Sequence, residues 1–464
     1  MSYATARRRD ANADLNRLYP EDRAVHEWYR FVLSFPPHLV REYIERFQVG
    51  PRGQVLDPFC GTGTVAVECK KLGVAAVGIE ANPMAHFASS VKTDWSPDPD
   101  ELIDHARHVA ADAYRRLADQ GIEDNPAFSA EGPGAEALRC LDAEQQGLLL
   151  SDSISSLPLH KVLVLLDCLN LRSNESLGRH EKLALAKSVV YSSSNLHFGP
   201  EVGIGVIRSD APVIDPWLAG VRAMSEDLRS LDDSQDVPVR IIRGDSRQAS
   251  ASIEPASIDS VITSPPYPNE KDYTRTTRLE SVLLGYIRTK ADLRALKKGM
   301  LRSNTRGVYQ ADDDDRWVVG QSEVQRLALE IERRRIDLGK TSGFERMYAR
   351  VTKLYFGGMA RHLAELRTLL RPGAHLAYVV GDQASYLRVM IRTGQILADI
   401  ADSLGYEVES IDLFRTRLAT ATREQLREEV VVLRWPGSEK LGAGDLVPVD
   451  LEAYRLRPRR DDRE

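Results

Sequence analysis

Val55-Leu56-Asp57-Pro58-Phe59-Cys60-Gly61-Thr62-Gly63-Thr64 is a short apolar run that ends in a glycine-rich turn. A helical pattern follows the turn, and a second apolar run then ends at Glu80. The order of strand, glycine turn, helix and strand is typical of the first βαβ unit of a parallel sheet. Glycines in such a turn let the backbone approach a ligand at the helix N-terminus. The stretch therefore predicts an α/β fold with a ligand site at this turn.

The same segment indicates which ligand the turn binds. Glu80 closes the second strand, where a carboxylate can accept hydrogen bonds from ribose hydroxyls. Ala66 stands in place of the third glycine of the dinucleotide fingerprint, and no phosphate-binding lysine follows the turn. A nucleoside cofactor without phosphates, such as S-adenosylmethionine, fits this pattern better than a dinucleotide.

A second motif, Thr263-Ser264-Pro265-Pro266-Tyr267, follows a predicted strand at 257–263. Its prolines fix φ and lack N–H donors, so that the carbonyls and the Ser264 hydroxyl can accept hydrogen bonds from an amino group. Tyr267 offers a face on which a flat ring can stack. Taken alone, a Pro-Pro pair beside a strand is more often an ordinary turn. Because open α/β sheets bind ligands beyond the C-terminal ends of their strands, we expect the two motifs to face each other.

The two motifs together resemble those of the S-adenosylmethionine-dependent amino methyltransferases of DNA, which make N4-methylcytosine or N6-methyladenine. The resemblance implies that Ser264 to Tyr267 form the catalytic clamp. It also implies a set of cofactor-binding residues, namely Asp57, Phe59, Gly61, Gly63, Glu80 and Asp245. For Asp245, a role beside the adenine ring and an ordinary turn aspartate are equal alternatives. The segment from His26 to Pro37 looks like the family element over the methionine end of the cofactor, with an aromatic helix start as its rival.

The resemblance implies a Rossmann-like class I methyltransferase sheet, mostly parallel and closed by an antiparallel hairpin, with helical insertions. It covers about 21–95 and 239–435, which we expect to form the catalytic domain. We further expect a flexible tail at 1–20, a mostly helical acidic insertion at 96–238, a basic insertion at 268–350 and a tail at 436–464. A long acidic insertion ahead of Asp245 departs from the family pattern, so which insertion reads DNA stays open.

Several local patterns predict individual elements. Residues 21–49 look helical, Leu157 to Asn170 predicts a buried helix, and Tyr348 to Leu370 predicts an amphipathic helix before a turn at 371–374. A further helix is expected near 391–404, and the closing strands are expected near 406–414 and 429–435. Tyr191 to Glu201 reads as a loop, which either lines the substrate pocket or lies at the surface.

The formal net charge is −6, but its distribution indicates a partner more clearly than its sum. Residues 96–237 hold 12 Lys and Arg against 24 Asp and Glu, whereas residues 268–350 hold 18 against 13. The second segment is therefore the better candidate for neutralising DNA phosphates. Its candidate DNA-binding residues are Lys271, Arg275, Arg278, Lys297, Lys298, Arg302 and Arg306.

The chemistry of an exocyclic amine sets the expected mechanism. Its lone pair is delocalised into the ring, so hydrogen bonds from the amino group to Ser264 and the Pro265 carbonyl would redirect it toward the methyl donor. The base must leave duplex DNA to reach the clamp, and Tyr267 would stack on it. No cysteine follows a proline, so a covalent mechanism is not expected, and no metal is implied. Serine before Pro-Pro-Tyr favours cytosine N4 over adenine N6.

Three other functions compete with this interpretation. An RNA base methyltransferase can use a comparable clamp, a nucleic-acid-binding protein can keep the fold without catalysis, and glutamine methylation of proteins uses a clamp that begins with Asn. The intact motifs argue against the second, and Ser264 argues against the third. A restriction or defence partner and the oligomeric state stay open.

Composition agrees with a globular enzyme, since 42% of the residues are hydrophobic and 28% are charged. The four cysteines show no paired ligand spacing, which predicts a reducing, cytoplasmic location without disulfides or a structural zinc. No apolar run reaches membrane-spanning length, and no apolar region follows the basic residues of Met1 to Arg9 to make a secretory signal.

Overall fold

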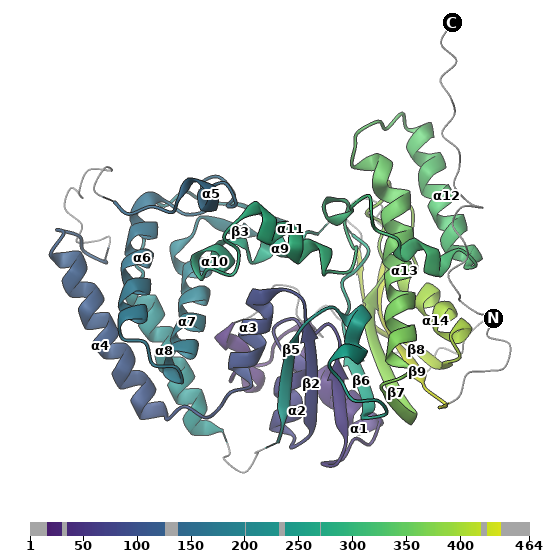
Figure 1. Ribbon diagram of the computed structural model, residues 1–464, viewed down its shortest axis with the longest axis horizontal. Helices are drawn as coiled ribbons and strands as arrows, with labels where there is room; N and C mark the ends of the chain where they lie inside the picture. The colour runs from purple at the N-terminus through teal and green to yellow at the C-terminus, as the bar shows by residue number, and fades with distance from the viewer. Residues whose placement is uncertain are drawn as a thin grey trace, which may run out of the picture.

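A seven-stranded mixed sheet forms the centre of the computed structural model, which describes residues 16–29, 35–125, 138–199, 201–231, 237–269, 271–418 and 425–437 (Figure 1). The predicted tails lie largely outside these ranges. In spatial order, the strands are β5 (Val239–Arg243), β2 (Ala75–Glu80), β1 (Gln54–Asp57), β6 (Ile258–Thr263), β7 (Leu370–Gly381), β9 (Gln425–Arg434) and β8 (Glu407–Leu418). The first five pair in parallel, and β9 runs antiparallel to both of its neighbours. The predicted Rossmann-like sheet with a closing hairpin is confirmed.

Helices cover both faces of this sheet, because alternate residues of each buried strand point to opposite sides. On one face α1 (Pro37–Arg46) and α2 (Thr64–Lys71) pack on residues such as Val55 and Ile262. On the other face α12 (Ser322–Asp337), α13 (Tyr348–Leu366) and α14 (Thr393–Ser403) pack on residues such as Leu56 and Val261. The helices predicted at 348–370 and 391–404 are thus confirmed. The predicted turn at 371–374 instead lies within β7, where Gly373 adopts a φ of 89° and the pairing with β6 shifts register.

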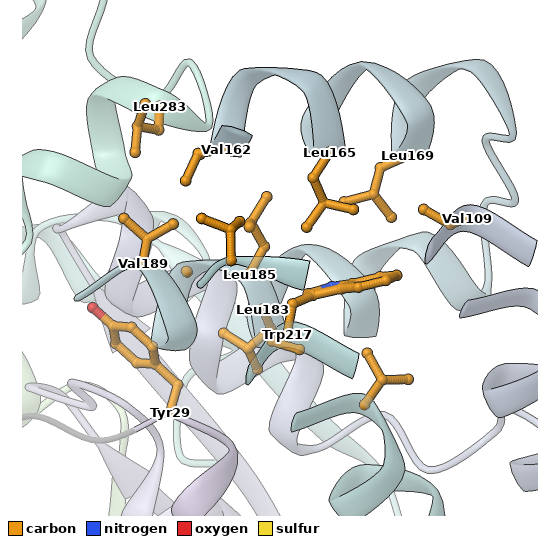
Figure 2. Packing of buried hydrophobic residues seen from close by; sticks show 14 of the residues in the cluster. Tyr29, Val109, Val162, Leu165, Leu169, Leu183, Leu185, Val189, Trp217 and Leu283 are labelled. Carbon is orange, nitrogen blue, oxygen red and sulfur yellow. The ribbon is translucent and has the colours of Figure 1, made fainter. Parts of the chain in front are cut away.

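A helical body lies beside the sheet (Figure 1). In the sequence, most of it stands between β2 and β5, although these two strands are neighbours in the sheet. It follows α3 (Pro83–Lys92) and contains α4 (Pro99–Ala118), α5 (Ala143–Gln146), α6 (Ser156–Leu171), α7 (Leu177–Ser188) and α8 (Ile214–Ser230). Trp217 is fully buried in its core, and Figure 2 shows its ring among Leu165, Leu169 and Leu183. The indole N–H donates to the carbonyl of Glu181. The predicted buried helix at 157–170 is confirmed as α6.

Two sequence-based element predictions were wrong in detail. The expected loop at 191–201 is instead a π-helical turn at Val189–Ser193 followed by a hairpin of β3 (Leu196–Phe198) and β4 (Val202–Ile204). The expected helix at 21–49 is broken, with short 3-10 turns at Pro20–Asp22 and His26–Trp28 before α1. His26 and Trp28 bond to Glu68 and Asp227, so side-chain contacts override the helical pattern here.

The basic segment 268–350 is shared between the two bodies. Its first part, with α9 (Tyr273–Thr276), α10 (Arg278–Leu283) and α11 (Lys290–Lys298), adds Leu279, Val282, Leu283 and Ile287 to the core of the helical body. Its last helix, α12, packs on α13 beside the sheet. Figure 1 shows α9, α10 and α11 above the sheet, between the helical body and the rest of the fold.

One buried carboxyl group ties α10 to the N-terminal segment. Glu280 is 1% exposed, and its Oε1 accepts a 2.5 Å hydrogen bond from the Tyr29 hydroxyl. Its Oε2 is buried and has no hydrogen-bond partner among the described residues. Burial raises the pKa of Glu280 to about 7, against an ordinary value of 4.5. The folded protein therefore keeps a proton that the unfolded chain releases.

This proton makes stability depend on pH in a predictable direction. Because the pKa of Glu280 is raised on folding, its contribution is fully present below pH 4.5 and is lost as pH rises through about 7. Glu280→Gln keeps an acceptor for Tyr29 but cannot ionise. We expect the unfolding free energy of this variant to fall less steeply between pH 5 and 7, by up to about 1.4 kcal/mol per pH unit. Urea unfolding across this range measures the slope, and Glu21→Gln at an exposed position is the control.

Within the described ranges, no helix combines the length and the apolarity that a membrane crossing requires. The four cysteines lie in these ranges as free thiols, and Cys60, Cys69 and Cys168 are buried.

Candidate active site

A cavity of about 650 Å³ lies at the C-terminal ends of the parallel strands. It is lined by residues from both sequence motifs, although these are far apart in the chain. The predicted site residues in its lining are Phe59, Gly61, Glu80, Asp245, Ser264, Pro265, Pro266 and Tyr267. The expectation that the glycine turn and the clamp face each other is therefore met by the geometry.

The glycine turn owes its shape to two left-handed residues. Gly61 has a φ of 53°, and Gly63 has a φ of 85° at the N-cap of α2. A Cβ on Gly63 would lie 2.9 Å from Cβ of Ser89 on α3, whereas a Cβ on Gly61 would meet nothing within 4 Å. Gly63 thus lets α2 and α3 approach each other behind the turn. Gly61 faces the cavity itself.

Glu80 holds the turn closed from the neighbouring strand. Its Oε2 accepts a 2.7 Å hydrogen bond from the backbone N–H of Gly61, and its Oε1 accepts one of 2.7 Å from Asn82. Burial raises the pKa of Glu80 above its ordinary value. The carboxylate therefore already has a structural role before any ligand is considered, and it remains part of the cavity lining.

Asp57 connects the two motifs from beneath the cavity. Its Oδ1 accepts a 2.6 Å hydrogen bond from the hydroxyl of Thr263 and one of 3.2 Å from the N–H of Phe59. Its Oδ2 is buried and has no hydrogen-bond partner among the described residues. Burial raises the pKa of Asp57 to about 7. An unpaired buried acceptor at this place is costly unless a ligand compensates it. Phe59 itself packs edge-on against the ring of His362, at 4.9 Å between centroids.

The clamp rests on strand β7. The Ser264 hydroxyl donates a 3.1 Å hydrogen bond to the carbonyl of Val379, so its own oxygen stays available as an acceptor. The ring of Tyr267 lies against Gly381, where a Cβ would come within 2.9 Å of it. Burial raises the pKa of the Tyr267 hydroxyl above its ordinary value, which keeps it neutral. The clamp thus combines the oxygen of Ser264, which also interacts with the Tyr267 side chain, with an aromatic ring.

The sequence comparisons agree with one another on the kind of protein that this chain resembles. Residues 7–89 match the family described as DNA methylase. The chain is 24% identical over 441 residues to the Type II methyltransferase M.BsoBI of Geobacillus stearothermophilus, covering 89% of this chain and 85% of that protein. It is also 24% identical over 444 residues to M.AvaI of Nostoc sp., covering 90% and 87%. These matches support an amino-methyltransferase family for the chain.

Two further matches are more limited. The Type II methyltransferase M.MjaII of Methanocaldococcus jannaschii is 35% identical to this chain over 84 residues, which is 18% of this chain and 16% of that protein. The crystal structure of TrmN from Thermus thermophilus overlaps with a TM-score of 0.27 at 11% identity, over 86% of this chain and about half, 48%, of that chain. The strand order itself carries the fold assignment.

Asp245 has hydrogen-bond and ion-pair partners within the protein. It caps a 3-10 helix at Ser246–Ala251, where it accepts a 3.0 Å hydrogen bond from the backbone N–H of Arg247. It also forms an ion pair with the guanidinium group of Arg247 at 2.6 Å. Arg247 also contacts Asp314. Asp245 therefore combines the turn role that the sequence allowed with a place in the cavity lining.

The predicted N-terminal element is only partly described. Its residue Phe35 lines the cavity, as does Asn16, which precedes the element in the chain. Arg30 and Phe31 of the predicted element lie outside the described residues.

The seven predicted DNA-binding cations fall into two groups. Arg302 is 4% exposed and bonds to Asp312 through two nitrogens at 2.8 Å each. Arg278 bonds to Thr274 and to the Leu148 carbonyl, and Lys297 bonds to Asp272. In this structure these three residues hold the segment together. Of the other four cations, Lys298 and Arg306 are exposed, whereas Lys271 and Arg275 are half-buried.

The cavity lining includes residues that the sequence analysis missed, among them three charged side chains of the closing hairpin. Arg415 and Arg417 on β8 and Glu428 on β9 line the cavity, and Arg415 bonds to Glu428 at 2.6 Å. Arg415 and Arg417 are two residues apart in a strand, so they share a face. That alternation, beside the predicted closing hairpin, was the signal that could have identified them.

Proposed function

We propose that this protein transfers a methyl group from S-adenosylmethionine to an exocyclic amino group in double-stranded DNA, at a specific site. We favour cytosine N4 over adenine N6. The observation that carries the proposal is a single cavity with Gly61 and Glu80 on one side and the clamp from Ser264 to Tyr267 on the other. A donor and an acceptor held there would meet at the sheet edge where α/β enzymes bind ligands.

The residues present suit S-adenosylmethionine, which supplies an electrophilic methyl group when bound. Gly61 and Gly63 allow close backbone approach, and the carboxylate of Glu80 lines the cavity where ribose hydroxyls would need acceptors. The cofactor carries positive charge at its sulfonium and ammonium groups, and the unpaired Oδ2 of Asp57 is a buried acceptor directly beneath the turn. Phe59 and Asp245 complete the proposed cofactor site.

The chain's own residues would position the acceptor amine. The oxygen of Ser264, whose hydrogen is donated to Val379, would accept one amino hydrogen, and the Pro265 carbonyl would accept the other. These bonds would turn the nitrogen lone pair out of the ring plane and aim it at the methyl group. Pro266 fixes the path of the clamp, and Tyr267, which Gly381 supports, would stack on the flipped base.

Several finer assignments rest on the same reasoning. The catalytic domain would comprise 21–95 and 239–435, with 96–238 and 268–350 as insertions. The names of M.BsoBI and M.AvaI as Type II methyltransferases support site-specific DNA methylation and a restriction enzyme as functional partner. A cytoplasmic location stays a prediction from the cysteine pattern. Serine in the clamp remains the basis for preferring cytosine.

The proposal predicts a defined product. The purified protein, incubated with unmethylated DNA and S-adenosylmethionine labelled in its methyl group, is expected to label the DNA. Digestion to nucleosides and mass analysis should then identify N4-methylcytosine. N6-methyladenine would overturn the base preference while keeping the amino methylation. Label found in RNA and absent from DNA would refute the DNA assignment.

A further inference from the structure

The rim of the active-site cavity carries an ionic contact between the helical body and the basic segment. Glu201, in the turn between β3 and β4, lines the cavity. Its Oε2 lies 4.0 Å from Nη1 of Arg275 and 3.6 Å from Nη1 of Arg306. Lys271 lines the same cavity, and although burial lowers its pKa, the charge of Glu201 acts in the opposite direction. Two arginines therefore contact one carboxylate, and a lysine of the same cavity is influenced by its charge.

The geometry of this contact is unlike a settled salt bridge. Both guanidinium distances exceed hydrogen-bond length and end at the same carboxylate oxygen, whereas Arg302 and Asp312 meet through two bonds of 2.8 Å. The Nε of Arg275 is buried and has no hydrogen-bond partner among the described residues. The charges attract each other, but these N–H donors of the two arginines form no hydrogen bond of ordinary length with Glu201.

A phosphodiester would use these donors better than Glu201 does. It carries the same single negative charge and two free oxygens, which a guanidinium group can bind in a bidentate manner. Two arginines that meet at one point, with a lysine lining the same cavity, are typical of phosphate recognition. Lys271 also lies four positions after Tyr267 in the chain, so a phosphate bound here would belong to the backbone close to the flipped base.

We propose that Glu201 occupies the place of a DNA phosphate when DNA is absent, and that DNA binding exchanges its carboxylate for a backbone phosphate held by Lys271, Arg275 and Arg306. This inference rests on the proposed function and names the contacts that serve it. The exchange keeps the cations neutralised throughout. Glu201 is 44% exposed in its side chain and lies on a hairpin of two short strands, so little structure opposes its departure.

The exchange predicts that removing the carboxylate strengthens binding. Affinity of the full-length protein for a short DNA duplex can be measured by fluorescence anisotropy over a range of salt concentrations. Because an exposed ion pair is weak, Glu201→Gln should tighten binding by about 2- to 5-fold without changing the slope of log K against log salt. Arg275→Gln and Arg306→Gln should weaken binding, and each should reduce that slope by about 1.

A second ion pair offers matched controls. Arg107 and Asp104 form a 2.7 Å contact on α4, in the helical body and outside the cavity lining. Asp104→Asn and Arg107→Gln change charge by the same amounts and should leave both affinity and slope near the wild-type values. A general effect of net charge would instead move these controls as much as the test variants, which would overturn the inference.

The other outcomes separate this inference from the proposed function. Unchanged or weaker binding by Glu201→Gln, or unchanged slopes in both arginine variants, refutes the phosphate exchange, even if the wild-type protein methylates DNA. The expected slope changes without any methyl transfer by the wild type would support the exchange and refute the proposed enzyme activity. A wild-type protein that binds no duplex refutes both.

Discussion

Replacing Ser264 by alanine is expected to lower kcat for methyl transfer by about 10²- to 10³-fold, the usual cost of removing one preorganised polar contact to a reacting group. The reason lies in the geometry of the hydroxyl. Its hydrogen is engaged by the Val379 carbonyl at 3.1 Å, so its oxygen is held as an acceptor at the cavity wall. Alanine leaves the backbone of the clamp in place and removes the hydroxyl, with its bond to Val379 and its acceptor oxygen.

The measurement is single-turnover methyl transfer with saturating cofactor, together with cofactor affinity by calorimetry. Affinity for S-adenosylmethionine should stay near the wild-type value, since Ser264 lies on the acceptor side. Ser250→Ala is the matched control, because that hydroxyl bonds to Glu365 away from the cavity. A Ser264→Ala enzyme with nearly full kcat would show that the hydroxyl does not direct the amine.

Gly63→Ala is expected to weaken binding of S-adenosylmethionine by about 10- to 100-fold, since a side chain held in the left-handed region costs on the order of 1–3 kcal/mol. The new methyl group would also lie 2.9 Å from Cβ of Ser89, so α2 and α3 must separate. Both effects would distort the glycine turn, which lines the cavity through Gly61.

Gly61→Ala is the informative comparison for this prediction. Its φ of 53° also carries strain, of about 1–2 kcal/mol, but its Cβ would meet no atom within 4 Å. Calorimetric titration with the cofactor and thermal unfolding of both variants should rank Gly63→Ala as the more damaging. Equal effects would show that contact with Ser89 is unimportant. The opposite order would indicate that a methyl group at Gly61 obstructs the ligand directly.

The sheet and the position of the site were predictable from the sequence because both depend on local patterns. An apolar run, a glycine turn and an acidic strand end identify β1, α2 and β2, and the rule for parallel sheets places the Ser264 clamp at the same edge. The family was predictable for the same reason, since its two motifs are short and continuous. The closing strands expected near 406–414 and 429–435 were confirmed as β8 and β9, both being longer than expected.

The parts that could not be predicted depend on contacts between distant residues. The sequence identifies a cationic stretch but not the side chains that bind its cations. Arg302 was therefore predicted to bind DNA phosphate, whereas the structure shows it in two hydrogen bonds to Asp312. The split of 268–350 between two cores, the broken helix near His26 and the place of Glu201 opposite Arg275 and Arg306 have the same origin. Each is set by tertiary packing, which overrides local propensity.

The direct pairing of β2 with β5 has an evolutionary consequence. Glu80 pairs with Arg243 although helices α4 to α8 of the helical body lie between the two strands in the sequence. This part of the body can therefore change in length without moving the catalytic edge of the sheet. However, Leu279, Val282 and Leu283 of α10 belong to the core of that body. A transplant between homologues would therefore have to carry two separate stretches of gene, 96–238 and the region around α10, as a single inherited unit.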